Sequence, residues 1–368
     1  CTITLPSVAT AGDQIILVDY ARTWGTNAIT IDSNGLNFQG ETDLYIVDYD
    51  TSGQAVNLVY SGATVGWTPS SDIVNALEPV APVTQKAIFG FGDDDSKVSI
   101  TNLVNSSGVV ATDTTGVGTG RLSLAAAGYG LDKAIFGYGN TGSYVSMTNL
   151  VSNSGVVATD VTGVGTARGE LAASGYGTDK AIFGYGTTGS NVSLTNLVNN
   201  SGVVAADVSG VGTARKNLTA ARYDIDKAIF GYGLTGSIVS LTNLVSSIGV
   251  VSADVSGVGT ARRALASASY GLDKAIFGYG YTGSNVSLTN LVSNTGVVAA
   301  DVSGVGSARR ELAATSFGGD KAIFGYGFVS GNVSMTNLVN SSGVVASDVT
   351  GVGTARYGLA AAGYSTSA

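Results

Sequence analysis

The chain has 368 residues, of which only 12% are charged, with a net charge of −8 and no histidine. This composition gives no electrostatic reason to bind nucleic acid or an anionic membrane. The absence of histidine excludes Ser-His-Asp catalysis, histidine general bases and His-rich zinc sites. Cys1 is the only cysteine, so no disulfide can form within the chain and its stability has to come from packing.

Residues 1–79 alternate polar and apolar side chains in short runs, which are separated by turn signals such as Asp32-Ser33-Asn34-Gly35. The predicted strands cover residues 2–5, 14–19, 28–31, 43–47 and 56–60. We interpret this region as a small β-sandwich-like domain for attachment or assembly. A stiff linker is expected over residues 80–85, because Pro79 and Pro82 restrict the backbone there.

Residues 86–368 consist of a repeat with a period of 47 residues. A period of this length indicates a solenoid, a propeller or an array. In the unit that starts at Leu171, the predicted strands cover residues 171–177, 180–186, 191–198 and 202–208, and four strands are the content of one propeller blade. The motif Lys-Ala-Ile-Phe-Gly-Tyr/Phe-Gly marks the copies and begins at Lys86, Lys133, Lys180, Lys227, Lys274 and Lys321.

The phase of the repeat predicts how its two ends meet. The first copy lacks the small-residue strand that precedes the motif elsewhere, and residues 359–365 supply such a strand with no motif after it. We therefore predict an all-β fold in which the C-terminal strand joins the first copy and closes a six-bladed β-propeller, so that no sheet edge is exposed. The alternative, an open solenoid, would need polar capping repeats.

Two regions resemble known families. Residues 11–41 and 58–69, with Gly12-Asp13, Asp19, the Asn34-Gly35 turn and Gly66-Trp67 in order, resemble a small β module of tail-fibre and appendage proteins of tailed bacteriophages. The repeat is similar to Kelch-type propellers, in which a small-residue strand precedes an apolar strand that ends in a Gly pair or Gly-aromatic-Gly, although no Gly-Gly doublet closes the second strand here. These resemblances imply a virion appendage that carries a Kelch-like propeller.

Charged residues recur with the repeat, whereas a catalytic site is a single asymmetric constellation. We therefore predict a structural role in which each arginine hydrogen-bonds an aspartate or loop carbonyls between blades, and each mid-strand asparagine bonds neighbouring backbone. The aspartates are Asp113, Asp160, Asp207, Asp254, Asp301 and Asp348, and the arginines are Arg121, Arg168, Arg215, Arg262, Arg309 and Arg356. The asparagines are Asn102, Asn149, Asn196, Asn243, Asn290 and Asn337.

Variation concentrates in the loop between the second and third strands and in the residue pair that follows each arginine. In an up-and-down blade both segments emerge on one face, which is therefore the predicted binding face. Aromatic and amide side chains there can stack on or hydrogen-bond a glycan or a partner protein. Drift in unconstrained loops is the alternative. The candidate binding residues are Tyr144, Asn191, Tyr281, Asn285, Phe328, Asn332 and Tyr357.

The sequence favours a non-enzymatic structural or binding protein of a bacteriophage virion, hence virion or extracellular, with no transmembrane segment and no cofactor. Its expected partners are virion or cell-surface proteins, a host glycan or a host surface protein, and the N-terminal domain allows a homo-oligomer. A bacterial cell-surface adhesin, lipid-anchored through Cys1, is the alternative. A sialidase-like glycoside hydrolase is the third hypothesis, with Asp93, Asp94 and Asp95 as its only candidates for paired catalytic carboxylates; such a triplet is typical of a solvated turn or a weak Ca²⁺ site.

Overall fold

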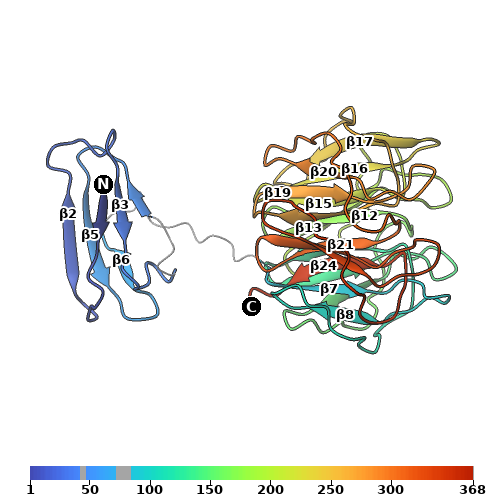
Figure 1. Ribbon diagram of the computed structural model, residues 1–368, viewed down its shortest axis with the longest axis horizontal. Helices are drawn as coiled ribbons and strands as arrows, with labels where there is room; N and C mark the ends of the chain where they lie inside the picture. Colours follow the sequence, from blue (N-terminus) through green and yellow to red (C-terminus); the bar gives the residue numbers. More distant parts are fainter. Residues whose placement is uncertain (42–46, 72–83, 368) are drawn as a thin grey trace. The chain divides into compact units, whose positions relative to one another are not determined.

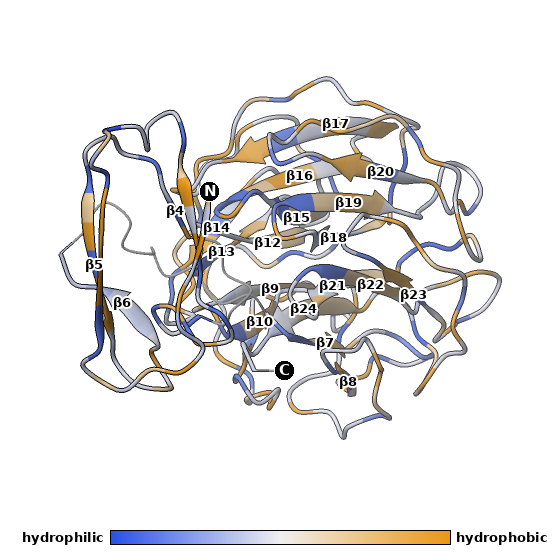
Figure 2. Cartoon of the chain, turned by 60° about the vertical axis from the view of Figure 1, so that its left-hand side comes forward, coloured by the Kyte–Doolittle hydropathy of each residue, from blue (hydrophilic) through white to orange (hydrophobic). Residues whose placement is uncertain are grey.

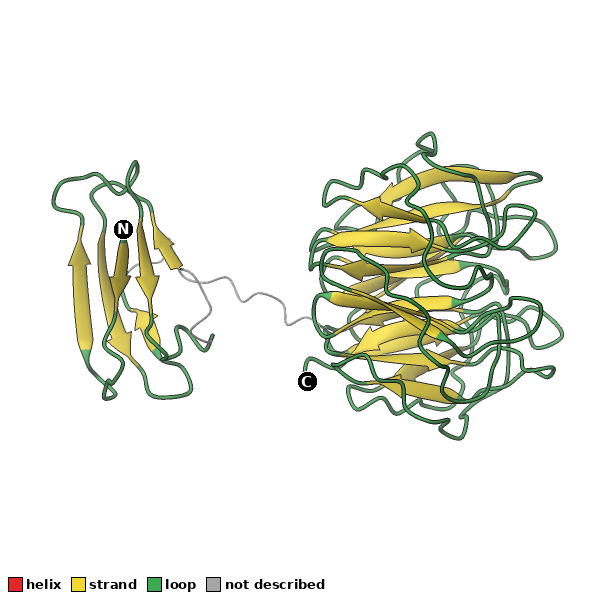
Figure 3. Cartoon of the chain, in the orientation of Figure 1, coloured by secondary structure: helices red, strands yellow, loops and turns green. Residues whose placement is uncertain are grey.

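The computed structural model describes residues 1–41, 47–71 and 84–367. Every regular element in these residues is a β-strand and none is a helix (Figure 1, Figure 3). This finding confirms the all-β class predicted from the strand pattern. The chain divides into two compact units, Cys1–Val80 and Ala81–Ala368. Residues 80–83 of the predicted linker lie outside the described residues.

The N-terminal unit contains two three-stranded sheets that share one buried core. Ile31 and Tyr49 contribute to this core from the first sheet, and Leu58 and Trp67 contribute from the second. Strands β1 and β3 are parallel, and the other neighbours are antiparallel. The first sheet consists of β1 (Thr2–Thr4), β3 (Ile29–Asp32) and β4 (Val47–Tyr49), and the second of β2 (Gln14–Val18), β5 (Ala55–Tyr60) and β6 (Trp67–Pro69).

Four of the strands predicted in this unit agree with the structure to within one residue at each end. The fifth prediction, residues 43–47, falls mostly on residues 42–46, which lie outside the described part of the chain. The predicted turn is confirmed, because Asn34 and Gly35 adopt left-handed backbone conformations with φ of 55° and 84°. Strand β6 was missed because it is only three residues long and ends in a proline, which argues against a strand.

The repeats form six antiparallel sheets of three strands each. We call the strands of each sheet first, second and third in the order in which they pair. The first strands are β24 (Ala360–Tyr364), β9 (Ala125–Tyr129), β12 (Ala172–Tyr176), β15 (Thr219–Tyr223), β18 (Ala266–Tyr270) and β21 (Ala313–Phe317). The second strands are β7 (Lys86–Gly90), β10 (Lys133–Gly137), β13 (Lys180–Gly184), β16 (Lys227–Leu234), β19 (Lys274–Gly278) and β22 (Lys321–Gly325). The third strands are β8 (Thr101–Val104), β11 (Thr148–Val151), β14 (Thr195–Val198), β17 (Ile238–Val245), β20 (Thr289–Val292) and β23 (Thr336–Val339).

The last strand of the chain completes the sheet of the first repeat. Strand β24 pairs antiparallel with β7, with Ala360 opposite Gly90 and Tyr364 opposite Lys86. The amide of Gln85 extends this pairing by donating to the carbonyl of Ser365 at 2.8 Å. The first strands also contact one another in a cyclic order, from β24 to β9, β12, β15, β18 and β21 and back to β24.

The fourth strand predicted for each repeat is wrong, because the corresponding segment forms only isolated bridges. In the third repeat Val204 is bridged to Val198, and Val208 is bridged to Thr195. Five residues, 204–208, therefore lie opposite four, 195–198, and the extra residue interrupts the ladder as in a β-bulge. The third strand is also shorter than predicted, since β14 begins at Thr195 instead of Asn191.

Each second strand is buried on both faces, as its sequence predicted. Ala181, Ile182 and Phe183 have no exposed surface, and the hydrophobic clusters combine residues of neighbouring sheets. The strands of the repeats accordingly carry the hydrophobic colour over much of their length in Figure 2. Burial on two faces requires an almost unbroken apolar run, which explains why the second strand does not alternate.

The residue after each second strand turns its aromatic ring toward the next sheet. Tyr185 has a left-handed backbone with φ of 62°, and its ring centroid lies 5.1 Å from that of Phe230. The register between β16 and β17 shifts between Gly231 and Gly233, so that Tyr232 is left out of the ladder. The bulge explains the Gly-aromatic-Gly motif, because the residue after the aromatic has a positive φ that glycine tolerates.

Candidate functional site

The repeated arginines are fully buried at the centre of a polar network whose aspartates are partly exposed. The side chain of Arg215 has no exposed surface. Its Nε donates to the carbonyl of Tyr232 at 2.9 Å, and its terminal nitrogens donate to the carbonyl of Thr213 at 3.2 Å and to the side-chain oxygen of Asn243 at 2.6 Å. The guanidinium also lies 4.3 Å from the centroid of the Tyr185 ring. Burial lowers the pKa of Arg215, and these interactions compensate for the lost hydration.

Each aspartate belongs to the network of the preceding repeat. Asp254 accepts hydrogen bonds from the amide and hydroxyl of Thr213 at 3.0 and 2.5 Å and from the amide group of Asn243 at 2.9 Å. Burial acts to raise the pKa of Asp254, but these hydrogen bonds outweigh it and lower the pKa below its usual value. Arg215 approaches this carboxylate only to 3.8 Å. We predicted that each arginine bonds either an aspartate or loop carbonyls. The structure shows hydrogen bonds from Arg215 to carbonyls and none to Asp254.

The network repeats six times with one variation. In five repeats the stacked ring is a tyrosine whose hydroxyl donates to a valine carbonyl, as Tyr138 does to Val164 at 3.1 Å. Phe91 occupies this position in the first repeat, and its ring lies 4.2 Å from the guanidinium carbon of Arg121. Burial lowers the pKa of Arg121 to about 10.

Replacing Phe91 by tyrosine is expected to stabilise the protein. The new hydroxyl would reach the carbonyl of Val117, which corresponds to Val164 in the next repeat. A hydrogen bond of this kind contributes about 1 kcal/mol to the free energy of unfolding. Chemical denaturation of F91Y measures the gain, and Y138F is the matched control with a loss of similar size. Equal stability of F91Y and the wild type would contradict this account.

The residues just before the first strands form a closed cycle of backbone hydrogen bonds, which we call the rim. Each rim amide donates to the rim carbonyl of the neighbouring repeat at 2.8 to 2.9 Å, and the sixth bond returns to the first residue. All six residues have a positive φ between 53° and 63°. The rim consists of Ser123, Glu170, Asn217, Ala264, Glu311 and Gly358.

Two carboxylates lie on the rim in different electrostatic environments. Glu170 accepts a hydrogen bond from Asn217 at 2.6 Å and forms an ion pair with Lys216 at 3.0 Å. Glu311 lies three repeats further along the six-membered cycle and 3.6 Å from Arg310. Burial raises the pKa of Glu311, Arg310 opposes this shift, and the negative charge of Glu170 adds to it. In the sequence, Glu170 and Glu311 appear only as members of variable pairs. The repeat pattern does not give the distance between them across the cycle.

An aromatic-arginine cluster lies beside the rim and extends over three repeats. Arg310 lies 5.1 Å from the ring centroid of Tyr281 and 4.7 Å from that of Phe328. Phe328 in turn meets Tyr357 edge to face, with ring centroids 5.9 Å apart. Arg263 lies 5.2 Å from the Tyr281 ring. The cluster, Tyr281, Arg310, Phe328, Tyr357 and Arg263, is half-buried, so part of every side chain is exposed to solvent.

The variable pair of each repeat is bridged to the variable loop of the next repeat in the cycle, as the prediction of a common face requires. Arg263 is bridged to Tyr281, Arg310 to Phe328, and Tyr357 to Asp93. The predicted proximity of the Tyr281 and Phe328 loops is therefore seen in the structure, with Arg310 in contact with both rings.

Other candidate binding residues have structural partners. The side-chain amide of Asn191 donates to the carbonyls of Leu234 and Thr235 in the next repeat, at 3.0 and 2.7 Å. Asn285 bonds the carbonyls of Phe328 and Val329 in the same way.

Of the remaining candidates, Asn332 and the Asp93–Asp95 triplet adjoin the cluster through bridges to Phe328 and Tyr357, and Tyr144 lies apart from it. Asn332 is bridged to Phe328 within one loop. Tyr144 lies against Gly169, two repeats away from the cluster by sequence order. The triplet Asp93–Asp95 is a hydrogen-bonded turn, in which the amide of Asp95 donates to the Asp93 carboxylate at 3.0 Å. Among the described residues no group of three or more acidic, histidine or cysteine side chains is arranged to hold a metal ion.

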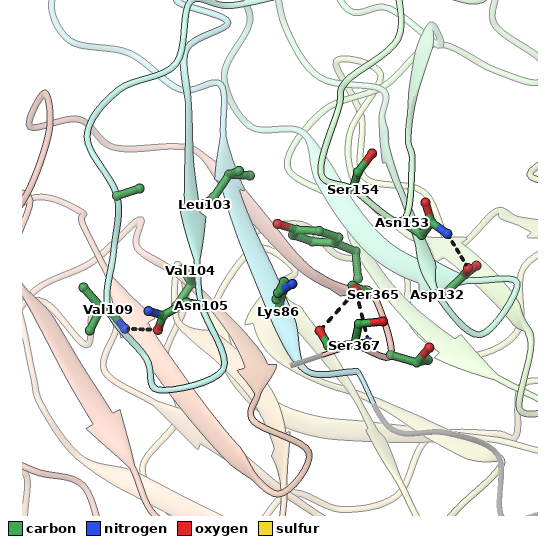
Figure 4. A pocket seen from close by; sticks show the side chains of 13 residues that line it. Lys86, Leu103, Val104, Asn105, Val109, Asp132, Asn153, Ser154, Ser365 and Ser367 are labelled. Carbon is green, nitrogen blue, oxygen red and sulfur yellow. Dashed lines mark hydrogen bonds between the residues drawn. The ribbon is translucent and has the colours of Figure 1, made fainter. Parts of the chain in front are cut away.

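A pocket of about 640 Å³ lies at the end of the sheets opposite to the aromatic-arginine cluster, where β24 joins the first repeat (Figure 4). Lys86 and Tyr364 line one part of it, and Asp132 and Asn153 line another and are hydrogen-bonded to each other at 3.2 Å. In the other five repeats the corresponding lysine forms an ion pair with a nearby aspartate. Gln85 precedes Lys86, and within the described residues the Lys86 ammonium forms no ion pair.

Comparison with known proteins assigns no family. No protein-family model matches the chain, and a search of the curated proteins finds no match. Among the described residues no helix is long and apolar enough to cross a membrane. A functional assignment therefore depends on the unrepeated side chains, which are the rim carboxylates and the aromatic-arginine cluster.

Proposed function

We propose that the repeats form a closed six-bladed β-propeller and that the chain is a non-enzymatic binding protein of a tailed-bacteriophage virion. In this proposal the protein is an appendage or tail-fibre-type component at the virion surface. The N-terminal unit serves attachment or assembly and forms any homo-oligomer. The propeller presents its variable face to a host glycan, a host surface protein or an assembly partner.

Three observations support a closed ring of six blades. The first strands contact each other in cyclic order, β24 completes the sheet of the first repeat, and the rim bonds return to their starting residue. The arginine-centred network follows the same cycle, because Thr354 of the last repeat donates to Asp113 of the first at 2.6 Å. A ring of this kind leaves no terminal sheet edge to cap.

The contact of Arg310 with both Tyr281 and Phe328 is the observation that carries the binding role. Repeated side chains hold the sheets together, whereas these three residues belong to the variable segments and stay partly exposed. Aromatic rings provide large contact area for a sugar or a protein surface, and a neighbouring guanidinium adds directional donors. The half-buried packing holds the rings in place before a ligand arrives, which reduces the entropy lost on binding.

Replacing Tyr281 and Phe328 together by alanine is expected to leave folding intact and to weaken attachment to host cells or the assembly partner by at least about tenfold, because hot-spot aromatics commonly contribute more than 1 kcal/mol each. Cell-binding and pull-down assays measure the effect. The matched control replaces Ile248 and Leu272, which are 75% and 57% exposed in turns at the opposite ends of the sheets. Wild-type binding by Y281A/F328A would place the binding role in the N-terminal unit.

The rim carboxylates define the enzymatic alternative. Burial raises the pKa of Glu311, as is expected of a general acid, whereas Glu170 is ion-paired with Lys216, as is expected of an ionised carboxylate that acts as base or nucleophile. In our proposal these carboxylates belong to the binding face and hold Lys216 and Arg310 in place. Turnover of a chromogenic glycoside by the wild type that is lost in E311Q would overturn the non-enzymatic assignment.

A further inference from the structure

Arg222 is the one charged residue in the first strands of the repeats. It stands in the fourth position of β15, where neighbouring first strands have only glycine or serine. The corresponding residues are Gly128, Gly175, Ser269, Ser316 and Gly363. A long cation among such small residues has no counterpart in the repeated framework and points to a separate role.

Neighbouring residues in the same position indicate where this side chain runs. A Cβ atom on Gly128 would lie 3.2 Å from the carbonyl oxygen of Gly363, and one on Gly175 would lie 3.4 Å from that of Gly128. The hydroxyl of Ser269 donates to the carbonyl of Arg222 itself at 2.7 Å. Each such side chain therefore starts over the backbone of the preceding first strand. The Arg222 side chain therefore starts over Gly175, beside the space that the six first strands surround.

The guanidinium of Arg222 lacks a fixed partner. Among the described residues it makes no hydrogen bond, ion pair or ring contact, whereas Arg215 uses three of its nitrogens in hydrogen bonds. Burial lowers the pKa of Arg222, and the charge of Asp226 opposes this shift only in part. The side chain is half-buried, so solvent reaches it. A partly desolvated cation with free donors is a favourable position for an anion.

We propose that Arg222 binds a small oxyanion in the space between the first strands. The planar guanidinium offers paired donors that match the two oxygens of a carboxylate or of a phosphate. The other residues in the same position are uncharged, so Arg222 supplies the one positive charge there, and Asp226 is the carboxylate whose charge acts on it. This site is separate from the aromatic-arginine cluster and does not depend on the ligand or protein that the cluster is proposed to bind.

Calorimetric titration of the full chain with inorganic phosphate, and separately with acetate, at constant ionic strength tests the proposal. The wild type is expected to bind at least one of the two anions, and its Tm should rise with the logarithm of that anion's concentration. R222S copies the residue of the neighbouring repeats and is expected to fold, to lose at least about tenfold in affinity and to lose the rise in Tm. R22S, which removes an exposed cation of the N-terminal unit, should bind like the wild type.

The two anions distinguish a phosphate-bearing from a carboxylate-bearing ligand, and binding of either that disappears in R222S supports the site. General salt effects on stability would appear equally in all three proteins. Equal responses of R222S and the wild type, or binding of neither anion by the wild type, would overturn the proposal.

Discussion

Deletion of residues 358–368 is expected to lower the Tm of the repeat unit by more than about 10 °C, which corresponds to a loss of more than about 5 kcal/mol in a unit of this size. The deletion removes β24 with the buried side chains of Leu359 and Tyr364, and it exposes the edge of β7. It also breaks the rim at Gly358. Truncating one large buried side chain alone costs about 2 to 5 kcal/mol.

The two tryptophans give this experiment an internal control. Trp24 and Trp67 both lie in the N-terminal unit, so their fluorescence reports the unfolding of that unit alone. Differential scanning calorimetry should show one lowered transition, while the fluorescence transition stays unchanged. Deletion of residues 366–368, which leaves β24 intact, is the matched control. An unchanged calorimetric profile for the longer deletion would refute the role of β24.

The second large effect is expected for Arg215→Ala, with a loss of about 3 to 5 kcal/mol in the free energy of unfolding, because removing one partner of a buried charged network leaves the others without hydrogen bonds. The carbonyls of Thr213 and Tyr232 and the side-chain oxygen of Asn243 would lose their donors. Denaturant titration measures the loss, and Arg262→Ala should give a similar value because its contacts are the same.

R263A provides the control for R215A, because Arg263 is partly exposed and outside the buried network. Its stability should stay close to that of the wild type, since exposed substitutions usually change stability by less than about 0.5 kcal/mol. If R215A left stability unchanged and abolished binding, the arginine would be a functional residue and the structural assignment would be wrong.

The sequence predicted those parts of the fold that the repeat itself specifies. A fixed period identifies equivalent positions, so the burial of the second strands and the pairing of residues 359–365 with the first copy followed from pattern and phase. The repeated Arg, Asp and Asn residues could likewise be assigned to the framework. Their partners could not, because an arginine such as Arg121 lies close to Asp160 of the next repeat and not to Asp113 of its own.

Other features depend on small local differences that a pattern does not contain. One extra residue between Val204 and Val208 is enough to reduce the predicted fourth strand to two bridges. Asn191 and Asn285 looked available for a ligand, but bonds to carbonyls 43 and 44 residues away occupy their side-chain amides. Arg222 was missed because it stands out only when the first strands are aligned, where the neighbouring strands have Gly175 and Ser269 in the same position.

The rim has a consequence for how this protein can diversify. Its six hydrogen bonds use only backbone atoms, and the positive φ of each residue already accommodates serine, glutamate, asparagine, alanine and glycine. Side chains can therefore be exchanged at these six places without removing a bond that holds the sheets in register. The opening they surround can acquire a new chemical character by single substitutions, so a library randomised at the rim should contain many folded members that differ in what they recognise.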